Sequence, residues 1–115
     1  MIGLIIEGAN DERKILEVSR DYHLVLTHGT KFSNREIFKI EEALSLCTSV
    51  YILTDPDQSG NWLANRIREY FPNIPRIKVD PDKAKIRRPR GDKFGIEYMS
   101  HQSLKEILPI EKPLD

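Results

Sequence analysis

The sequence has little material for cross-links or for soft-metal chemistry. Only one of its 115 residues is a cysteine, Cys47, so an intrachain disulfide is excluded. A lone cysteine at the end of a helical pattern is typically a small buried hydrophobe. The three histidines form no Cys/His cluster with the spacing of zinc ligands. The composition therefore excludes a disulfide-stabilised fold and disfavours a zinc site.

Long hydrophobic runs and a net charge of one sign are also missing. No apolar run approaches the ~20 residues that a membrane-spanning helix needs, and the N-terminus does not resemble a secretory signal. Eighteen basic and eighteen acidic residues cancel, so the overall charge argues neither for nor against a polyanionic partner. We expect a cytoplasmic protein without a membrane partner. Its length predicts a single domain, residues 1–115, with a frayed tail from about residue 109.

Short apolar runs alternate with longer amphipathic stretches, a pattern that favours parallel strands joined by helices. Strands are expected at residues 1–6, 24–27, 50–53 and 74–79. Helices are expected after the N-cap Asn10 to about Arg20, from the capping box of Ser33 and Glu36 to Leu46, at 59–71, and from Ser100 or Ser103 to Leu108. The expected fold class is α/β: one compact, Rossmann-like domain with a mostly parallel four-stranded sheet flanked by helices. Residues 80–92 are expected to form an exposed loop.

Acidic residues follow two of the expected strands directly. Asp55 and Asp57 come after strand 50–53, and Glu7 comes after strand 1–6. If these strands are parallel neighbours, the three carboxylates meet at one edge of the sheet. Two unit charges ~4 Å apart repel by about 4 kcal/mol at an effective dielectric of 20, so the cluster takes up protons unless a cation lies between them. Oxygen ligands suit Mg²⁺ or Mn²⁺, and the sequence predicts such a site.

Each of the three acids also has a purely structural interpretation. Asp57 has the residue type and position of a helix N-cap. Asp55 before proline is typical of a residue that initiates a turn, and Glu7 fits a solvated strand end. Spacing alone leaves these alternatives open.

A basic segment follows the fourth expected strand. It contains six basic residues against one acid, Asp92, and these are Lys83, Lys85, Arg87, Arg88, Arg90 and Lys93. A solvated charged loop is the plain interpretation. The segment follows a strand whose end lies at the carboxylate edge, and guanidinium groups suit bidentate phosphate binding. We therefore predict a nucleic-acid-binding surface here. His28, after the second strand, is a secondary candidate for contact with a phosphate or a water, unless it is a loop histidine without a role.

Four segments resemble the Toprim (topoisomerase-primase) superfamily. These are Glu7-Gly8, Thr27-His28-Gly29, the run Val50-Tyr51-Ile52-Leu53-Thr54-Asp55-Pro56-Asp57 with Gly60 beyond it, and Phe94-Gly95-Ile96-Glu97-Tyr98-Met99-Ser100 after the basic segment. Within it the chain is most similar to the ribonucleases that mature 5S ribosomal RNA precursors and to small stand-alone Toprim proteins. Their pattern has Asn where His28 stands and His where Tyr98 stands, and an additional C-terminal RNA-binding region that has no counterpart here.

The resemblance implies roles for individual residues. Glu7 becomes a general acid/base and metal ligand, Asp55 and Asp57 become ligands of Mg²⁺, and Glu97 becomes a secondary candidate. The implied function is Mg²⁺-dependent phosphodiester chemistry on nucleic acid, as ribonuclease-like cleavage of structured RNA. One alternative is a non-catalytic module that binds metal and nucleic acid and needs a protein partner to supply RNA binding. Another is a phosphoacceptor domain with Asp55 as the nucleophile.

Overall fold

The computed structural model describes residues 1–29 and 32–111. Its main sheet consists of β1 (Ile2–Ile6), β2 (Tyr22–Leu26) and β3 (Ser49–Ile52), all parallel and in the order β2-β1-β3. Every residue of the central strand β1 is buried. The helices are α1 (Ala9–Val18), α2 (Asn34–Leu46), α3 (Gln58–Tyr70) and α4 (His101–Ile107). The predicted α/β class with a parallel sheet flanked by helices is confirmed.

The predicted number of four strands in this sheet is wrong. Residues 74–79 form one isolated parallel bridge with β3, between Arg76 and Ile52. The Ile52 N–H donates to the Pro75 carbonyl at 2.9 Å, and the Ile77 N–H donates to the Ile52 carbonyl at 2.8 Å. Pro75 has no N–H of its own, which limits how far this segment can pair.

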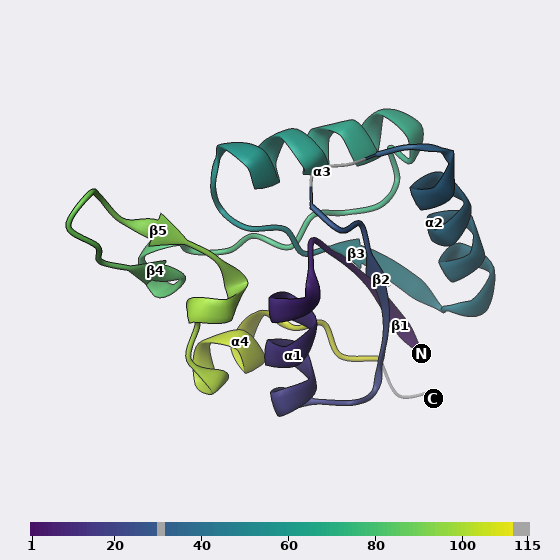
Figure 1. Cartoon of the computed structure of the whole chain (residues 1–115). Coiled ribbons are helices and arrows are strands. Elements are labelled where there is room, and N and C mark those ends of the chain that lie inside the picture. The colour runs from purple at the N-terminus through teal and green to yellow at the C-terminus, as the bar shows by residue number, and fades with distance from the viewer. Residues whose placement is uncertain (30–31, 112–115) are drawn as a thin grey trace.

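Two layers of helices cover the two faces of the sheet (Figure 1). Alternation along β1 sends its side chains to both faces, so that one core contains Leu4 and Ile6 while the other contains Ile5. The first core joins the sheet to α1 and α4 through Ile15 and Leu104. The second joins it to α2 and α3 through residues that include Ile40, Ala43, Leu63, Ala64 and Ile67.

Residues 80–92 do not form the simple loop that we predicted. It begins with a short 3₁₀ helix (Pro81–Lys83) and continues as an antiparallel pair of strands, β4 (Lys85–Ile86) and β5 (Lys93–Phe94). The Gly91 N–H closes the turn on the Arg88 carbonyl at 3.0 Å, with Gly91 at a φ of 118°. We call residues 85–94 the basic arm. It projects away from the sheet (Figure 1). Residues 86–93 are exposed.

Local capping explains where the helices begin. The Ser33–Glu36 capping box is confirmed, because the Ser33 N–H donates to the Glu36 carboxylate at 3.2 Å. Ser100 is the N-cap of α4, and its Oγ accepts from the Ser103 N–H at 3.0 Å. The N-cap of α1 is Gly8 and not Asn10, and its N–H donates to Asp11 Oδ2 at 3.3 Å.

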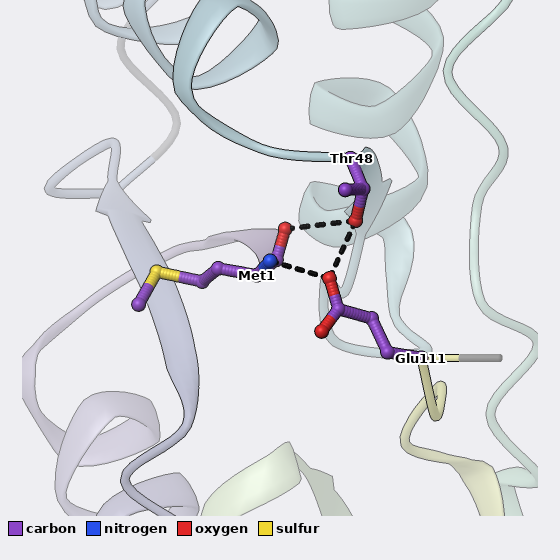
Figure 2. Close-up of polar contacts among 3 residues, drawn as sticks. All are labelled: Met1, Thr48 and Glu111. Carbon is purple, nitrogen blue, oxygen red and sulfur yellow. Dashed lines mark hydrogen bonds and ion pairs between the residues drawn. The ribbon is translucent and has the colours of Figure 1, made fainter. Parts of the chain in front are cut away.

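The first residue of the sequence, which precedes β1, is joined to the last described residue. The N-terminal amine of Met1 forms an ion pair with the Glu111 carboxylate, and the Thr48 hydroxyl contacts both residues (Figure 2). Close by, the Tyr22 hydroxyl donates to the Pro109 carbonyl at 2.6 Å. Residues 112–115 lie outside the described residues, so the frayed tail stays a prediction. Within the described part of the chain, no helix has the length and hydropathy to span a membrane.

Candidate active site

At the carboxyl ends of β1 and β3 the chain leaves the sheet toward opposite faces. β1 continues into α1, which covers one face of the sheet, and the neighbouring strand β3 continues into α3, which covers the other. In open α/β sheets, adjacent strands whose connections leave to opposite faces create a binding crevice at their carboxyl ends. Glu7 directly follows the first of these strands, and Asp55 lies just beyond the second. The fold therefore brings together two acids that are 48 residues apart in sequence.

The Asp55-Pro56-Asp57 loop is held against the first turn of α3. The Thr54 hydroxyl, fully buried, donates to the Gly60 carbonyl at 2.9 Å, and the Gly60 N–H donates to Asp57 Oδ1 at 2.7 Å. A Cβ on Gly60 would lie 1.9 Å from the Asp55 carbonyl oxygen. Only glycine allows the helix and the loop to approach this closely.

Backbone hydrogen bonds orient the carboxylates of Glu7 and Asp55. Glu7 Oε1 accepts from the Asp55 N–H at 3.0 Å, which ties the end of β1 to the loop after β3. Asp55 Oδ1 accepts from the Ile96 N–H at 2.8 Å, which ties the same loop to the segment after the basic arm. Three parts of the chain thus meet at Asp55.

Burial makes these acids hold protons more strongly than usual. It raises the pKa of Glu7 to about 7, and the negative charges of Asp55 and Asp57 contribute to the rise. Burial also raises the pKa of Asp55, against the opposing effect of the Ile96 hydrogen bond. Like charges gathered in a half-buried crevice favour the binding of either protons or a cation.

Asp11 belongs to the same cluster, and the sequence analysis missed it. Its side chain is only 6% exposed, and burial together with the charges of Asp55, Glu7 and Glu97 raises its pKa to about 7. In the sequence, Asp11 looked like an ordinary acid in the first turn of a helix. Its burial depends on how α1 packs against the segment around Glu97, which local sequence does not reveal.

Arg76 is the second residue that the sequence analysis missed. Its Nη2 donates to the Asp55 carbonyl at 3.1 Å, and its Nη1 donates to Asn61 Oδ1 at 2.8 Å. Burial lowers the pKa of Arg76, while the charges of Glu7 and Asp57 raise it. Its place in a predicted strand concealed this role, although an arginine in an otherwise apolar strand is a usable signal.

The other predicted site residues have different surroundings. Asp57 is the N-cap of α3, as its structural interpretation proposed, and its charge still acts on Glu7. Glu97 is half-buried near the cluster, where its charge raises the pKa of Asp55. His28 occupies an exposed turn with a φ of 56° and lines a pocket beside β2 with Lys39 and Glu42.

The structure divides the six predicted basic residues into two groups. Lys85 forms ion pairs with Asp82 and Asp92 at 3.5 and 3.9 Å, and Lys83 pairs with Glu106 at 3.7 Å. For the other four, no ion pair occurs within the described part of the chain, and these are Arg87, Arg88, Arg90 and Lys93. The Lys93 charge lowers the pKa of Asp55, so the base of the arm lies near the acids.

The donor set suits a hard dication, although its ligands are not gathered into a cage. Among residues 1–29 and 32–111, no group of three or more His, Cys, Asp and Glu side chains has the geometry to hold a metal ion. Mg²⁺ is usually bound through one or two protein carboxylates, with waters and substrate phosphates as the other ligands. Glu7 and Asp55 meet that requirement in residue type, charge and proximity.

Comparisons with known proteins agree on one family. The family model described as Toprim domain matches residues 4–86. Proteins named Ribonuclease M5 are similar to the chain. That of Staphylococcus aureus is 24% identical, and the match covers 97% of this chain and 61% of its own length. That of Bacillus subtilis is 29% identical, and the match covers 91% of this chain and 54% of its own length. The chain thus spans little more than half the length of these relatives. A solved structure, that of a small TOPRIM domain protein from Bacillus stearothermophilus, has the same fold, with a TM-score of 0.67, 20% identity and coverage of 91% of this chain and 83% of its own.

Replacing Gly60 with alanine tests the close approach of α3 to the Asp55-Pro56-Asp57 loop, which we call the acid loop. We expect Gly60→Ala to lower the free energy of unfolding by at least ~2 kcal/mol, because the Asp55 backbone must move away from the new methyl group. The matched control is Gly8→Ala, since a Cβ on Gly8 meets no atom within 4 Å. Urea unfolding measures both variants. Equal destabilisation by the two substitutions would contradict the packing described here.

The raised acid pKa values predict a protein that loses stability as the pH rises. The folded-state pKa of Asp11 is about 7, whereas the ordinary value for an aspartate is 3.8, so the folded state binds more protons than the unfolded state between these two values. Stability therefore falls through this window and levels off above it. We expect the free energy of unfolding of metal-free Asp11→Asn to rise relative to that of the wild type between pH 4 and pH 7. At pH 7 the difference should reach about 1–3 kcal/mol in favour of the variant. Thermal unfolding in EDTA measures the difference, and a gap that narrows as the pH rises would contradict the assignment.

Proposed function

The chain belongs to the Toprim domain family, and on that premise we propose that its acid cluster performs Mg²⁺-dependent phosphodiester chemistry, as ribonuclease-like cleavage of structured RNA. The observation that carries the proposal is the contact between Glu7 and Asp55. Two half-buried carboxyl groups, one of them with a pKa near 7, lie in the crevice between β1 and β3. A group with this pKa is suited to move protons at neutral pH.

In the proposed reaction Glu7 acts as the general base and then as the general acid. It accepts a proton from the attacking water, and its raised pKa lets it return that proton to the leaving oxygen. The Asp55 N–H, which donates to Glu7 Oε1, fixes the direction of the carboxylate. The second oxygen of Glu7 remains for the proton.

Glu7 and Asp55 are the residues that would hold the metal ion, with Asp57 adding negative charge beside them and with Mn²⁺ as an alternative to Mg²⁺. When bound, a divalent ion polarises the phosphate and lowers the pKa of the attacking water. In the metal-free protein, protons and Arg76 offset the negative charge of the cluster. Oxygen donors of this kind match the preference of Mg²⁺ and Mn²⁺.

The choice of RNA rests on the relatives and on the basic arm. The similar proteins are named Ribonuclease M5, which favours RNA processing for the part of those proteins that this chain matches. The arm offers Arg87, Arg88 and Arg90 near its exposed tip, where phosphates can reach them. Its base lies near the acids through Lys93. RNA bound along the arm would therefore lead into the crevice.

A binding module without cleavage activity is the second candidate. Its support is that backbone N–H groups already occupy one oxygen each of Glu7, Asp55 and Asp57. Such a module would need a partner protein for catalysis or for further RNA binding. The phosphoacceptor alternative would require Asp55 to form a beryllofluoride adduct.

Neutralising the central acids tests the proposed activity. We expect Asp55→Asn and Glu7→Gln each to lower single-turnover cleavage of a structured RNA at least ~100-fold, because one removes a metal ligand and the other the proton carrier. Asp21→Asn is the control, since Asp21 is exposed at the other end of the sheet. Omitting Mg²⁺ should abolish cleavage by the wild type. Cleavage that is unaffected by both substitutions would exclude this site, and cleavage by no form of the protein would favour the binding module.

Neutralising the tip of the basic arm tests the RNA surface. We expect the triple substitution of Arg87, Arg88 and Arg90 by Gln to weaken RNA binding and to reduce the slope of log K against log salt by about 2–3. The matched control is the double substitution of Lys83 and Lys85 by Gln, because intrachain ion pairs already engage these lysines. Fluorescence anisotropy at several salt concentrations measures both. Equal slopes for the two variants would contradict the division of the six basic residues into those engaged in ion pairs and those available to phosphates.

A further inference from the structure

A cleft of about 380 Å³ lies beside the Asp55-Pro56-Asp57 loop. Pro56 and Asn61 line one side, and residues 76–79 with Pro81 line the other. Two of these residues are cations, Arg76 and Lys78, and the described lining contains no carboxylate. A cleft that attracts anions therefore adjoins the crevice that holds the acids.

Arg76 connects the cleft to the acid loop. Its two hydrogen bonds join it to the Asp55 carbonyl and to Asn61, which lies in the first turn of α3. These contacts fix the guanidinium plane, and they use only two of its five N–H groups. A fixed guanidinium with donors to spare suits an anion with several oxygens, such as a phosphate.

The same guanidinium lies within electrostatic reach of the acid cluster. The charge of Arg76 lowers the pKa of Glu7, and the charges of Glu7 and Asp57 act on Arg76 in return. A phosphate in the cleft would therefore lie next to the place where the carboxylates act. A ligand that fills both places needs two anionic groups in series.

We propose that this cleft binds a backbone phosphate of the substrate that neighbours the phosphate to be cleaved, with Arg76 as its contact and Lys78 as a second positive charge. The site selects a polynucleotide over a mononucleotide, because only a chain of at least two phosphates spans the crevice and the cleft. Ile77, Val79 and Pro81 give the cleft an apolar wall for the attached sugar. The inference rests on the proposed function for the identity of the polymer, while phosphate binding at Arg76 needs no cleavage.

Chemical-shift titration of ¹⁵N-labelled protein in EDTA tests the site without metal or turnover. The probes are hexauridylate and uridine monophosphate. With hexauridylate we expect the backbone signals of Asn61 and Lys78 and the Arg76 Nε–H signal to shift, with much smaller effects from the mononucleotide. Arg76→Gln should weaken hexauridylate binding at least ~3-fold and reduce the salt slope by about 0.7, the value for one phosphate contact on a single strand.

Arg68→Gln is the matched control, because Arg68 is an exposed arginine in the last turn of the same helix that carries Asn61. It should bind hexauridylate as the wild type does. Lys78→Gln changes an exposed side chain and should weaken binding by a smaller factor, so it decides the question if Arg76→Gln does not fold.

Signals that shift only on the basic arm, or nowhere, would overturn the proposal, as would wild-type affinity in both cleft variants. Equal cleft shifts from the mononucleotide and the hexamer would overturn the selection for a polymer. If the cleft responds but no RNA is cleaved, the phosphate site stands and the proposed activity fails. If RNA is cleaved but the cleft signals do not shift, the proposed activity stands and the phosphate site fails.

Discussion

The hydrogen bond from the Asp55 N–H to the Glu7 carboxylate is the contact on which the candidate site depends. It joins the ends of two neighbouring parallel strands, and it brings the acid that follows β1 against the backbone of the loop that follows β3. The loop is in turn fixed by Gly60, by Ile96 and by Arg76. Each of these contacts reaches Asp55 from a different part of the chain. The position of Asp55 therefore depends on how the whole carboxyl edge of the sheet is packed.

Repulsion among the clustered carboxylates explains why positively charged residues lie near them. Glu7, Asp11 and Asp55 all have raised pKa values in the metal-free protein, because burial and neighbouring carboxylates disfavour their charged forms. Arg76 supplies positive charge to Glu7, and Lys93 supplies it to Asp55. Such a site stores unfavourable charge that a dication or a proton relieves, and clusters of this kind are common where a protein acts chemically.

The prediction of the fold succeeded where local pattern and tertiary packing agree. The buried run of β1, the capping box at Ser33 and the start of the last helix at Ser100 or Ser103 are local signals. Each was confirmed, and Ser100 is the N-cap of that helix. The fourth strand failed because a short apolar segment with a proline resembles an edge strand, whereas the structure allows it a single bridge. The prediction of a loop at residues 80–92 failed because two strands of two residues each leave almost no hydrophobic pattern in a charged segment.

The sequence by itself determined the α/β class, the positions of Glu7 and Asp55 at the ends of strands, and the concentration of basic residues in one segment. These features depend on residue type and spacing along the chain, which hydrophobic periodicity and turn chemistry make readable. Only the tertiary structure decided that Asp11 and Arg76 belong to the surroundings of the acid cluster. It also decided that Lys83 and Lys85 form ion pairs, whereas the arginines near the tip of the arm form none with residues 1–29 and 32–111. Burial and long-range contact set those outcomes, because the field at a charged group depends on neighbours that are distant in sequence.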